Sequence, residues 1–327
     1  MGSDFKAIPL VDISALVEKV DHPGMADDGD LLDVIRELDR ACKDAGFFYV
    51  KGHGIAESLM AEVRDVTRSF FQLPLEEKRK IRLTHRTGYR GYQRVGQNIT
   101  KGKLDMHEAI DLSYSDLSSD KLSQQTTHGS ATRISNRASM EISASIWKEI
   151  ICDLSRKIMR GIALALGAPS DAFEGGTAGD PFWYLRLIGY PVPASIPQEQ
   201  RTDTGCGAHT DYGLLTLVNQ DDDICALEVR NLSGEWIQAK PVPGTFVCNI
   251  GDMLEVWCNG IYQPTLHRVF NSSPRYRVSV AFFYESNFDA VVEPAELCQE
   301  KTGGVAKYDK VVYGEHLVKK VLNNFVL

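Results

Sequence analysis

Short segments rich in β-branched and aromatic residues fill the chain after Pro181, and they constrain its fold more than any other feature. Turn sequences at 231–234 and 241–244 interrupt them with glycine and proline. Many short strands with regular breaks are typical of an antiparallel sandwich or barrel. We therefore predict a double-sheet β core built from segments 183–190, 214–218, 226–229, 246–250, 254–257, 267–270 and 277–284.

The first half of the chain shows helical periodicity instead. Apolar residues recur every three or four positions in three stretches, which predicts helices from Leu31 to Gly46, over 57–71 and over 139–166, the last one stopped by Gly167. The run 47–50 predicts a buried strand, and 314–324 a final helix. We expect a mainly β protein with flanking helices, divided into an N-terminal region 1–125, a spine helix region 126–175, a core 176–290 and a C-terminal helical segment 291–327.

Composition excludes several classes of function. The net charge of −8 disfavours a nucleic-acid partner, which usually meets a basic face. No apolar run reaches the roughly 18 residues of a membrane span, and the N-terminus lacks the apolar core of a secretory signal. The seven scattered cysteines include no CxxC pair and predict reduced thiols. We expect a cytoplasmic protein, by default a monomer, without a nucleic-acid or membrane partner.

Two histidines and one aspartate form the candidate metal site. His209 and Asp211 stand two positions apart, so an extended segment points both to one face, and His267 follows 56 positions later. Two imidazoles and a carboxylate with open positions are typical of non-haem Fe(II) and O2 chemistry. Zinc is the main alternative, but the chain has no HExxH motif that would supply a hydrolase with its general base.

A cation and a hydroxyl share one face of the last predicted core strand. Arg277 and Ser279 are two positions apart within an apolar run, where an arginine is costly unless it meets an anion. The alternatives are a structural salt bridge and a fork that binds the far carboxylate of an oxo acid.

With these residues in place, the chain resembles the 2-oxoglutarate- and Fe(II)-dependent dioxygenases, in the branch that includes isopenicillin N synthase. The resemblance covers nearly the whole length. Its blocks are IPLVD at 8–12, AGFF at 45–48, GHGI at 52–55, FFQLP at 70–74, EK at 77–78, LR at 185–186, YP at 190–191, HTDYG at 209–213, NIGD at 249–252, NG at 259–260, HRV at 267–269 and RVS at 277–279.

The resemblance implies a double-stranded β-helix, or jelly roll, wrapped by helices. It implies His209, Asp211 and His267 as Fe(II) ligands, Arg277 and Ser279 as ligands of the 2-oxoglutarate C5 carboxylate with Tyr190 as a further contact, and ascorbate as a candidate reductant. Such enzymes oxidise a substrate, usually by hydroxylation, while 2-oxoglutarate becomes succinate and CO2.

Two alternatives stay open at this point. Relatives that do not use 2-oxoglutarate, such as isopenicillin N synthase and aminocyclopropane-carboxylate oxidase, also keep the Arg-x-Ser pair. A catalytically silent jelly roll used for binding is the other alternative, although all three metal ligands are present. The chain also departs from many plant members at Ile188, where they carry an asparagine, and at Cys258, where they carry a threonine.

The segment 88–93 is dense in aromatic and polar side chains and lies over the active-site mouth in relatives. We predict that Tyr89, Arg90 and Tyr92 contribute to the substrate pocket, with Arg90 holding an acidic group. His107 is interpreted as a hydrogen-bonded structural residue.

Overall fold

The computed structural model describes residues 3–21, 28–84, 87, 90–113, 131–195 and 202–324, with only the backbone described for 131–146 and 322–324. Two β-sheets face each other at its centre. The larger has the strand order β1 (Leu10–Asp12), β2 (Phe47–Lys51), β12 (Phe246–Ile250), β9 (Leu215–Gln220), β14 (Arg277–Tyr284), β7 (Trp183–Tyr190), β6 (Glu108–Ser113) and β3 (Gly91–Gln93). The smaller has the order β11 (Trp236–Gln238), β10 (Leu227–Arg230), β13 (His267–Phe270) and β8 (Thr204–His209).

Every pairing in these two sheets is antiparallel except that of β1 with β2. Two further pairs lie outside them: β4 (Ile99–Thr100) with β5 (Lys103–Leu104), and β15 (Val291–Val292) with β16 (Val311–Val312). The spacing of the short segments predicted such a double-sheet β core, and the family resemblance implied that it is a jelly roll; the two sheets confirm both predictions.

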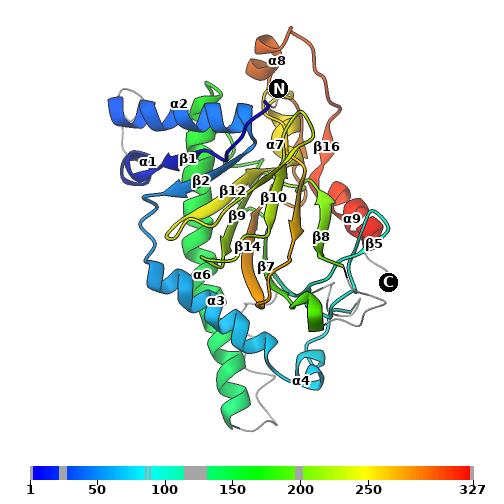
Figure 1. Ribbon diagram of the computed structural model, residues 1–327. Helices are drawn as coiled ribbons and strands as arrows, with labels where there is room; N and C mark the ends of the chain where they lie inside the picture. Colours follow the sequence, from blue (N-terminus) through cyan, green and yellow to red (C-terminus); the bar gives the residue numbers. More distant parts are fainter. Residues whose placement is uncertain are drawn as a thin grey trace.

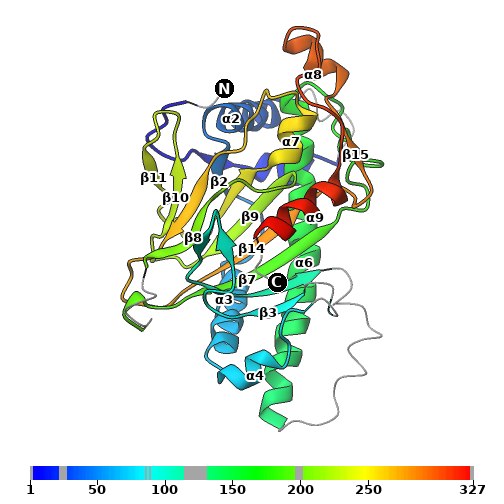
Figure 2. The ribbon, with the colours of Figure 1, turned by 90° about the vertical axis from the view of Figure 1, so that its right-hand side faces the viewer.

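Helices cover one face of the large sheet, and the small sheet faces the other (Figure 1 and Figure 2). The helices are α1 (Ser14–Lys19), α2 (Gly29–Asp44), α3 (Glu57–Phe71), α4 (Leu75–Arg79), α6 (Ala131–Ala165), α7 (Asp252–Trp257), α8 (Glu296–Lys301) and α9 (Tyr313–Asn324). A 3-10 turn, η3, spans Pro193–Ser195. The long helix α6 packs against α2 and α3 and lies along β9 and β14.

The alternation of side chains along each strand produces two cores. In β2, Phe48 and Val50 point into the cluster shared with the helices, whereas Phe47 and Tyr49 point into the cluster between the sheets. The same division holds for β14, where Phe282 faces the helices and Ala281 faces the small sheet. The large sheet therefore buries both faces, and its inner face forms one wall of the space between the sheets.

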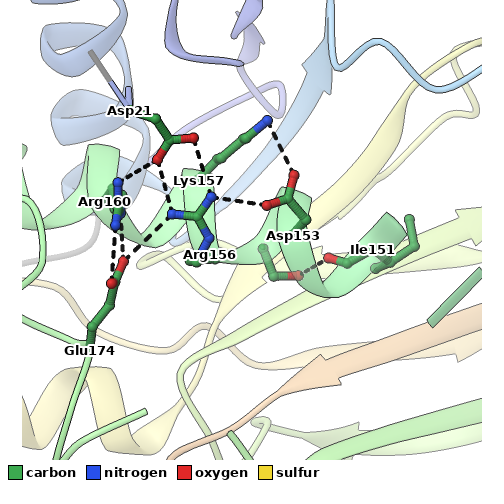
Figure 3. A network of polar contacts seen from close by, with 8 residues as sticks. Asp21, Ile151, Asp153, Arg156, Lys157, Arg160 and Glu174 are labelled. Atoms are coloured by element: carbon green, nitrogen blue, oxygen red, sulfur yellow. Dashed lines mark hydrogen bonds and ion pairs between the residues drawn. The ribbon is translucent and has the colours of Figure 1, made fainter. Parts of the chain in front are cut away.

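Charged residues fix the outer side of α6 (Figure 3). Arg160 forms ion pairs with Glu174 at 2.5 Å and with Asp21 at 2.5 Å, and Arg156 reaches Asp21 at 3.1 Å and Asp153 at 2.9 Å. The network ties the segment after α1 and the loop after α6 to the helix, on the side away from the sheets.

One predicted strand is wrong. Segment 254–257 belongs to α7, because the chain turns after β12 and the amides of Asp252 and Met253 donate to the carbonyls of Asp211 and Gly213. Met253, Leu254, Val256 and Trp257 are all buried on this short helix, and a mostly apolar segment of only four residues cannot distinguish a strand from a buried helix.

Two other differences concern the N-terminal half. Helix α6 begins at Ala131, eight residues before the predicted start. The first 113 residues also contribute β1, β2, β3 and β6 to the large sheet, so this half forms part of the β core as well as its helical cover. Within the described residues, no helix combines the length and the apolar character that crossing a bilayer requires. All seven cysteines are free thiols, as predicted.

Candidate active site

A cavity lies between the two sheets. The small sheet contributes residues of β8 and β13, and the large sheet contributes residues of β7 and β14. Helix α9, red in Figure 2, adds Tyr313, Leu317 and Val321 to the wall. Every described residue that the sequence singled out for metal or oxo-acid binding lines this one cavity: His209, Asp211, His267, Arg277, Ser279 and Tyr190.

The two histidines meet because β8 and β13 are antiparallel neighbours. His209 ends β8, His267 begins β13, and the two residues are paired in the register. Asp211 follows two residues after His209, and its Oδ1 lies 3.6 Å from His209 Nε2 and 3.5 Å from His267 Nε2. One potential ligand atom from each residue therefore falls within 4.8 Å of the others, as binding to a single ion requires.

Hydrogen bonds orient these three side chains. Nδ1 of His209 lies 2.8 Å from the carbonyl of Gly207, and Nδ1 of His267 lies 3.1 Å from the carbonyl of Thr265. A proton on each Nδ1 leaves the Nε2 lone pair facing Asp211, the arrangement that metal-bound histidines usually show.

Two further hydrogen bonds orient the carboxylate of Asp211. Thr216 Oγ1 and Asn249 Nδ2 each donate to Asp211 Oδ2 at 2.6 Å, so Oδ1 remains directed at the histidines. Burial alone would raise the pKa of Asp211, but the two histidines and Asn249 hold it below its ordinary value. A carboxylate and two imidazoles whose Nε2 atoms face it fit a divalent cation such as Fe(II), which would bind the Nε2 atoms in their deprotonated form.

Arg277 is a buried cation with unused hydrogen-bond donors. Its side chain is 1% exposed, and one guanidinium nitrogen, Nη2, donates to Gln220 Oε1 at 2.9 Å. Its Nε and Nη1 are buried and have no partner among the described residues. Because a buried unpaired N–H is costly, this guanidinium fits an anion bound in the cavity, such as the carboxylate of an oxo acid.

The neighbours of Arg277 come from β7. Tyr190 pairs with Arg277 in the register, and the guanidinium lies 4.8 Å from the centre of the Tyr190 ring. Ser279 pairs with Ile188, whose apolar side chain lines the cavity and cannot hydrogen-bond an anion. Arg277, Ser279 and Tyr190 thus supply polar groups to the part of the cavity between β7 and β14.

Of the predicted substrate residues that the structure describes, one lines the cavity and the other does not. Arg90 lines the cavity, where its guanidinium lies 5.7 Å from the ring of Phe182 and 5.5 Å from that of Tyr184. Tyr89 lies outside the described residues. Tyr92 is buried away from the cavity, since its hydroxyl donates to Glu108 Oε2 at 2.7 Å and its ring packs against Phe70.

His107 is hydrogen-bonded through both ring nitrogens, as its structural interpretation required. Nδ1 lies 2.7 Å from the Gly205 carbonyl, and Nε2 lies 3.1 Å from both Asn98 Nδ2 and Arg186 Nη2. Burial lowers the pKa of His107 to about 4, and Arg186 acts in the same direction.

Sequence reasoning missed four residues of the site. Thr216 and Asn249 lie on neighbouring strands in register with each other, and Gln220 fixes Arg277. Glu285, directly after β14, puts a further buried carboxylate into the cavity, besides those of Asp105 and Asp211. The period-two pattern could have placed Asn249 and Gln220 on the inner face, but nothing local distinguishes Glu285 from the other 43 acidic residues of the chain.

Comparisons with known proteins agree with this geometry. A family model described as the 2OG-Fe(II) oxygenase superfamily matches residues 184–286, and one described as the N-terminal region of non-haem dioxygenases in morphine synthesis matches residues 8–132. The chain is 71% identical to homoarginine-6-hydroxylase 2-ODD-233 of Oryza sativa subsp. japonica, with 100% of both chains covered. It is 54% identical to homoarginine-6-hydroxylase 2-ODD-C23.1 of Arabidopsis thaliana, again with 100% of both covered.

Solved structures share the fold. A full-length protein of Neurospora crassa, solved in complex with alpha-KG, superposes with a TM-score of 0.80 at 26% identity over 98% of both chains. JOX2, solved with 2OG, Fe and JA, superposes with a TM-score of 0.76 at 28% identity over 98% of this chain and 85% of that one. The chain therefore belongs to the 2OG-Fe(II) oxygenase superfamily and is a 2-oxoglutarate-dependent dioxygenase.

Proposed function

We propose that this enzyme hydroxylates homoarginine at C6. The observation that carries the proposal is the 71% identity, over the full length of both chains, to a protein named for that reaction. Three other proteins with the same activity in their names, at 51% to 56% identity, support it. The cavity also suits an amino acid with a cationic side chain, because it is lined by both basic and acidic groups, among them Arg90, Arg186 and Glu285.

In the proposed reaction, one atom of O2 enters the C6–H bond of homoarginine as a hydroxyl group. The other enters succinate, which forms as 2-oxoglutarate loses one carboxyl carbon as CO2. Bound Fe(II) supplies the activation of O2. The protein supplies the binding, the orientation and the electrostatic environment of the reactants.

We assign roles to residues on the same basis. His209 Nε2, Asp211 Oδ1 and His267 Nε2 hold the iron. Arg277 binds the far carboxylate of 2-oxoglutarate through Nε and Nη1, with Ser279 and Tyr190 beside it. The α-carboxylate of the substrate binds Arg90, whose guanidinium borders the cavity. Tyr92 has no part in this site, because its contacts lie in the core.

We further propose that the protein works as a cytoplasmic monomer on a free small molecule rather than on a nucleic acid. The net charge of −8 and the seven free cysteines support this proposal.

The test is succinate release by the purified protein with Fe(II), 2-oxoglutarate and O2. L-Homoarginine should raise it well above the rate without substrate, with one succinate formed for each homoarginine consumed. L-Arginine, one methylene shorter, should be a poorer substrate because its reactive carbon is displaced from the iron. Succinate release that homoarginine does not raise would contradict the proposal.

A further inference from the structure

The proposed substrate places a permanent positive charge next to the reacting carbon. C6 of homoarginine is bonded directly to a nitrogen of the guanidinium group, so oxidation at C6 requires this cation to lie close to the iron. A cation taken into a largely buried cavity requires an anionic partner there, since burying an unpaired charge is costly. The partner must be a carboxylate that the protein has not already used.

Three described carboxylates line the cavity, and two are occupied. Asp211 directs its Oδ1 at the two histidines, and its Oδ2 accepts hydrogen bonds from Thr216 and Asn249. Asp105 accepts a hydrogen bond on each oxygen, from the amide of Gly207 and from Thr100 Oγ1, both at 2.8 Å.

Glu285 is the third, and it has an unused oxygen. The residue is 4% exposed, yet its Oε2 has no hydrogen-bond partner among the described residues. The Tyr313 hydroxyl lies near enough to favour the charged form of Glu285, but the pair does not reach hydrogen-bond geometry, so this hydroxyl is unpartnered as well. A buried carboxylate oxygen without a donor is rare in folded proteins and calls for a ligand.

The position of Glu285 is set by Gly213, two residues after Asp211. A Cβ atom on Gly213 would overlap Glu285 Oε2, so the carboxylate fills the space that a side chain at this position would take. Helix α9 closes the other side with Tyr313. Glu285 thus borders the cavity beside the loop that carries Asp211, on the metal side of the site.

We propose that Glu285 determines substrate specificity by binding the guanidinium group of homoarginine beside the iron. This inference rests on the proposed function. Gly213 is the residue that leaves room for this carboxylate. The enzyme accepts substrates whose side chain ends in a planar cation and discriminates against neutral molecules of the same shape.

The electrostatics of the cavity agree with this role. Burial raises the pKa of Glu285 to about 8; Tyr313 lowers it, and the neighbouring Asp211 and Asp252 raise it further. A bound cation stabilises the ionised form, so the carboxylate becomes charged when the substrate arrives.

The test compares L-homoarginine with L-homocitrulline, which has the same length and shape but a neutral urea in place of the guanidinium. Wild-type protein loaded with Mn(II) and 2-oxoglutarate should bind homoarginine on the order of 100-fold more tightly by titration calorimetry, because only homoarginine forms the ion pair. Glu285→Gln, which keeps the shape and removes the charge, should lose most of that preference by losing affinity for homoarginine.

Glu255→Gln is the matched control. Glu255 is also a carboxylate with a raised pKa and a tyrosine partner, Tyr308 Oη at 2.9 Å, but it does not line the cavity. This variant should bind both molecules as wild type does. The circular dichroism spectrum and the calorimetric affinity for 2-oxoglutarate, both compared with wild type, show whether Glu285→Gln is folded and keeps its 2-oxoglutarate site.

The outcomes separate the two proposals. If wild type converts homoarginine but Glu285→Gln keeps the full preference over homocitrulline, the role of Glu285 is wrong and the proposed function stands. If homoarginine does not stimulate wild type, the proposed function fails. Should Glu285→Gln not fold, the wild-type comparison decides alone, because equal binding of the charged and neutral molecules overturns the inference.

Discussion

Two clusters of charge in this protein differ in whether their members have partners. On the outer side of α6, Arg156, Arg160, Asp21 and Glu174 all form ion pairs at the edge of solvent (Figure 3). In the cavity between the sheets, Arg277 and Glu285 are buried, and polar atoms of both lack a partner among the described residues.

The difference follows from what each cluster must do. Exposed ion pairs contribute little stability each, so the α6 cluster ties two loops to a helix at small gain. Buried charges without partners cost stability, and a fold retains them where a ligand completes them. We therefore interpret the α6 cluster as structural and the cavity cluster as the protein's half of two binding sites.

The largest effect should come from the metal ligands, which line the same cavity as Arg277 and Glu285. His209→Ala removes one of three ligand atoms and should abolish both iron binding and succinate release. Metal content and succinate release measure this, with Glu255→Gln as the control that keeps both. Iron-dependent succinate release that persists in His209→Ala would refute the ligand assignment.

The next test replaces Arg277 by an apolar side chain of similar length. In Arg277→Met, loss of two charge-assisted hydrogen bonds at about 1.5 kcal/mol each should raise KM for 2-oxoglutarate on the order of 100-fold. The unliganded variant should melt at the wild-type temperature or above it, because a buried unpaired cation has been removed. A large fall in Tm with an unchanged KM would instead make Arg277 a structural residue like those on α6.

The pH dependence of substrate binding tests whether Glu285 binds the cationic group of the substrate. Because the pKa of Glu285 is raised to about 8 in the free protein, binding a cation below that pH must first remove a proton. KM for homoarginine should therefore fall as the pH rises through the pKa that Glu285 has in the metal-loaded protein, and level off above it. Bound metal offsets the charge of Asp211 and moves the step to lower pH.

Glu285→Gln should flatten this profile, since it removes the group that titrates. The same step retained in the variant would assign the titration to another group.

The smallest effect is expected outside the cavity. Arg160→Ala should lower Tm by about 2–4 °C, since its half-buried side chain forms two ion pairs that solvent still screens, each contributing on the order of 1 kcal/mol at most. The difference should shrink in about 1 M NaCl, and KM for both substrates should not change. A change in KM of the size expected for Arg277→Met would show that the α6 cluster also contributes to binding, and would contradict its interpretation as structural.

The sequence predicts the parts of this site that depend on local periodicity. Period-two spacing placed Arg277 with Ser279 on β14, and the strands that carry His267 and Arg277 begin at those residues as predicted. His209 and Asp211 also lie together, but β8 ends at His209, so the loop after the strand and not strand periodicity sets the position of Asp211. The strand predicted at 254–257 was wrong because its conformation is set by contacts of Asp252 and Met253 with the loop after β8. Glu285 could not be found because its role depends on the space above Gly213 and on the packing of α9.

The most direct measurement is a crystal structure of the protein with Mn(II), 2-oxoglutarate and homoarginine. We expect a guanidinium nitrogen of homoarginine at about 2.7–2.9 Å from a carboxylate oxygen of Glu285, and the far carboxylate of 2-oxoglutarate on Arg277 Nε and Nη1. A complex in which Glu285 does not touch the substrate, or in which those two nitrogens of Arg277 still lack a partner, would contradict the claim that the unpaired polar atoms of the cavity are its binding groups.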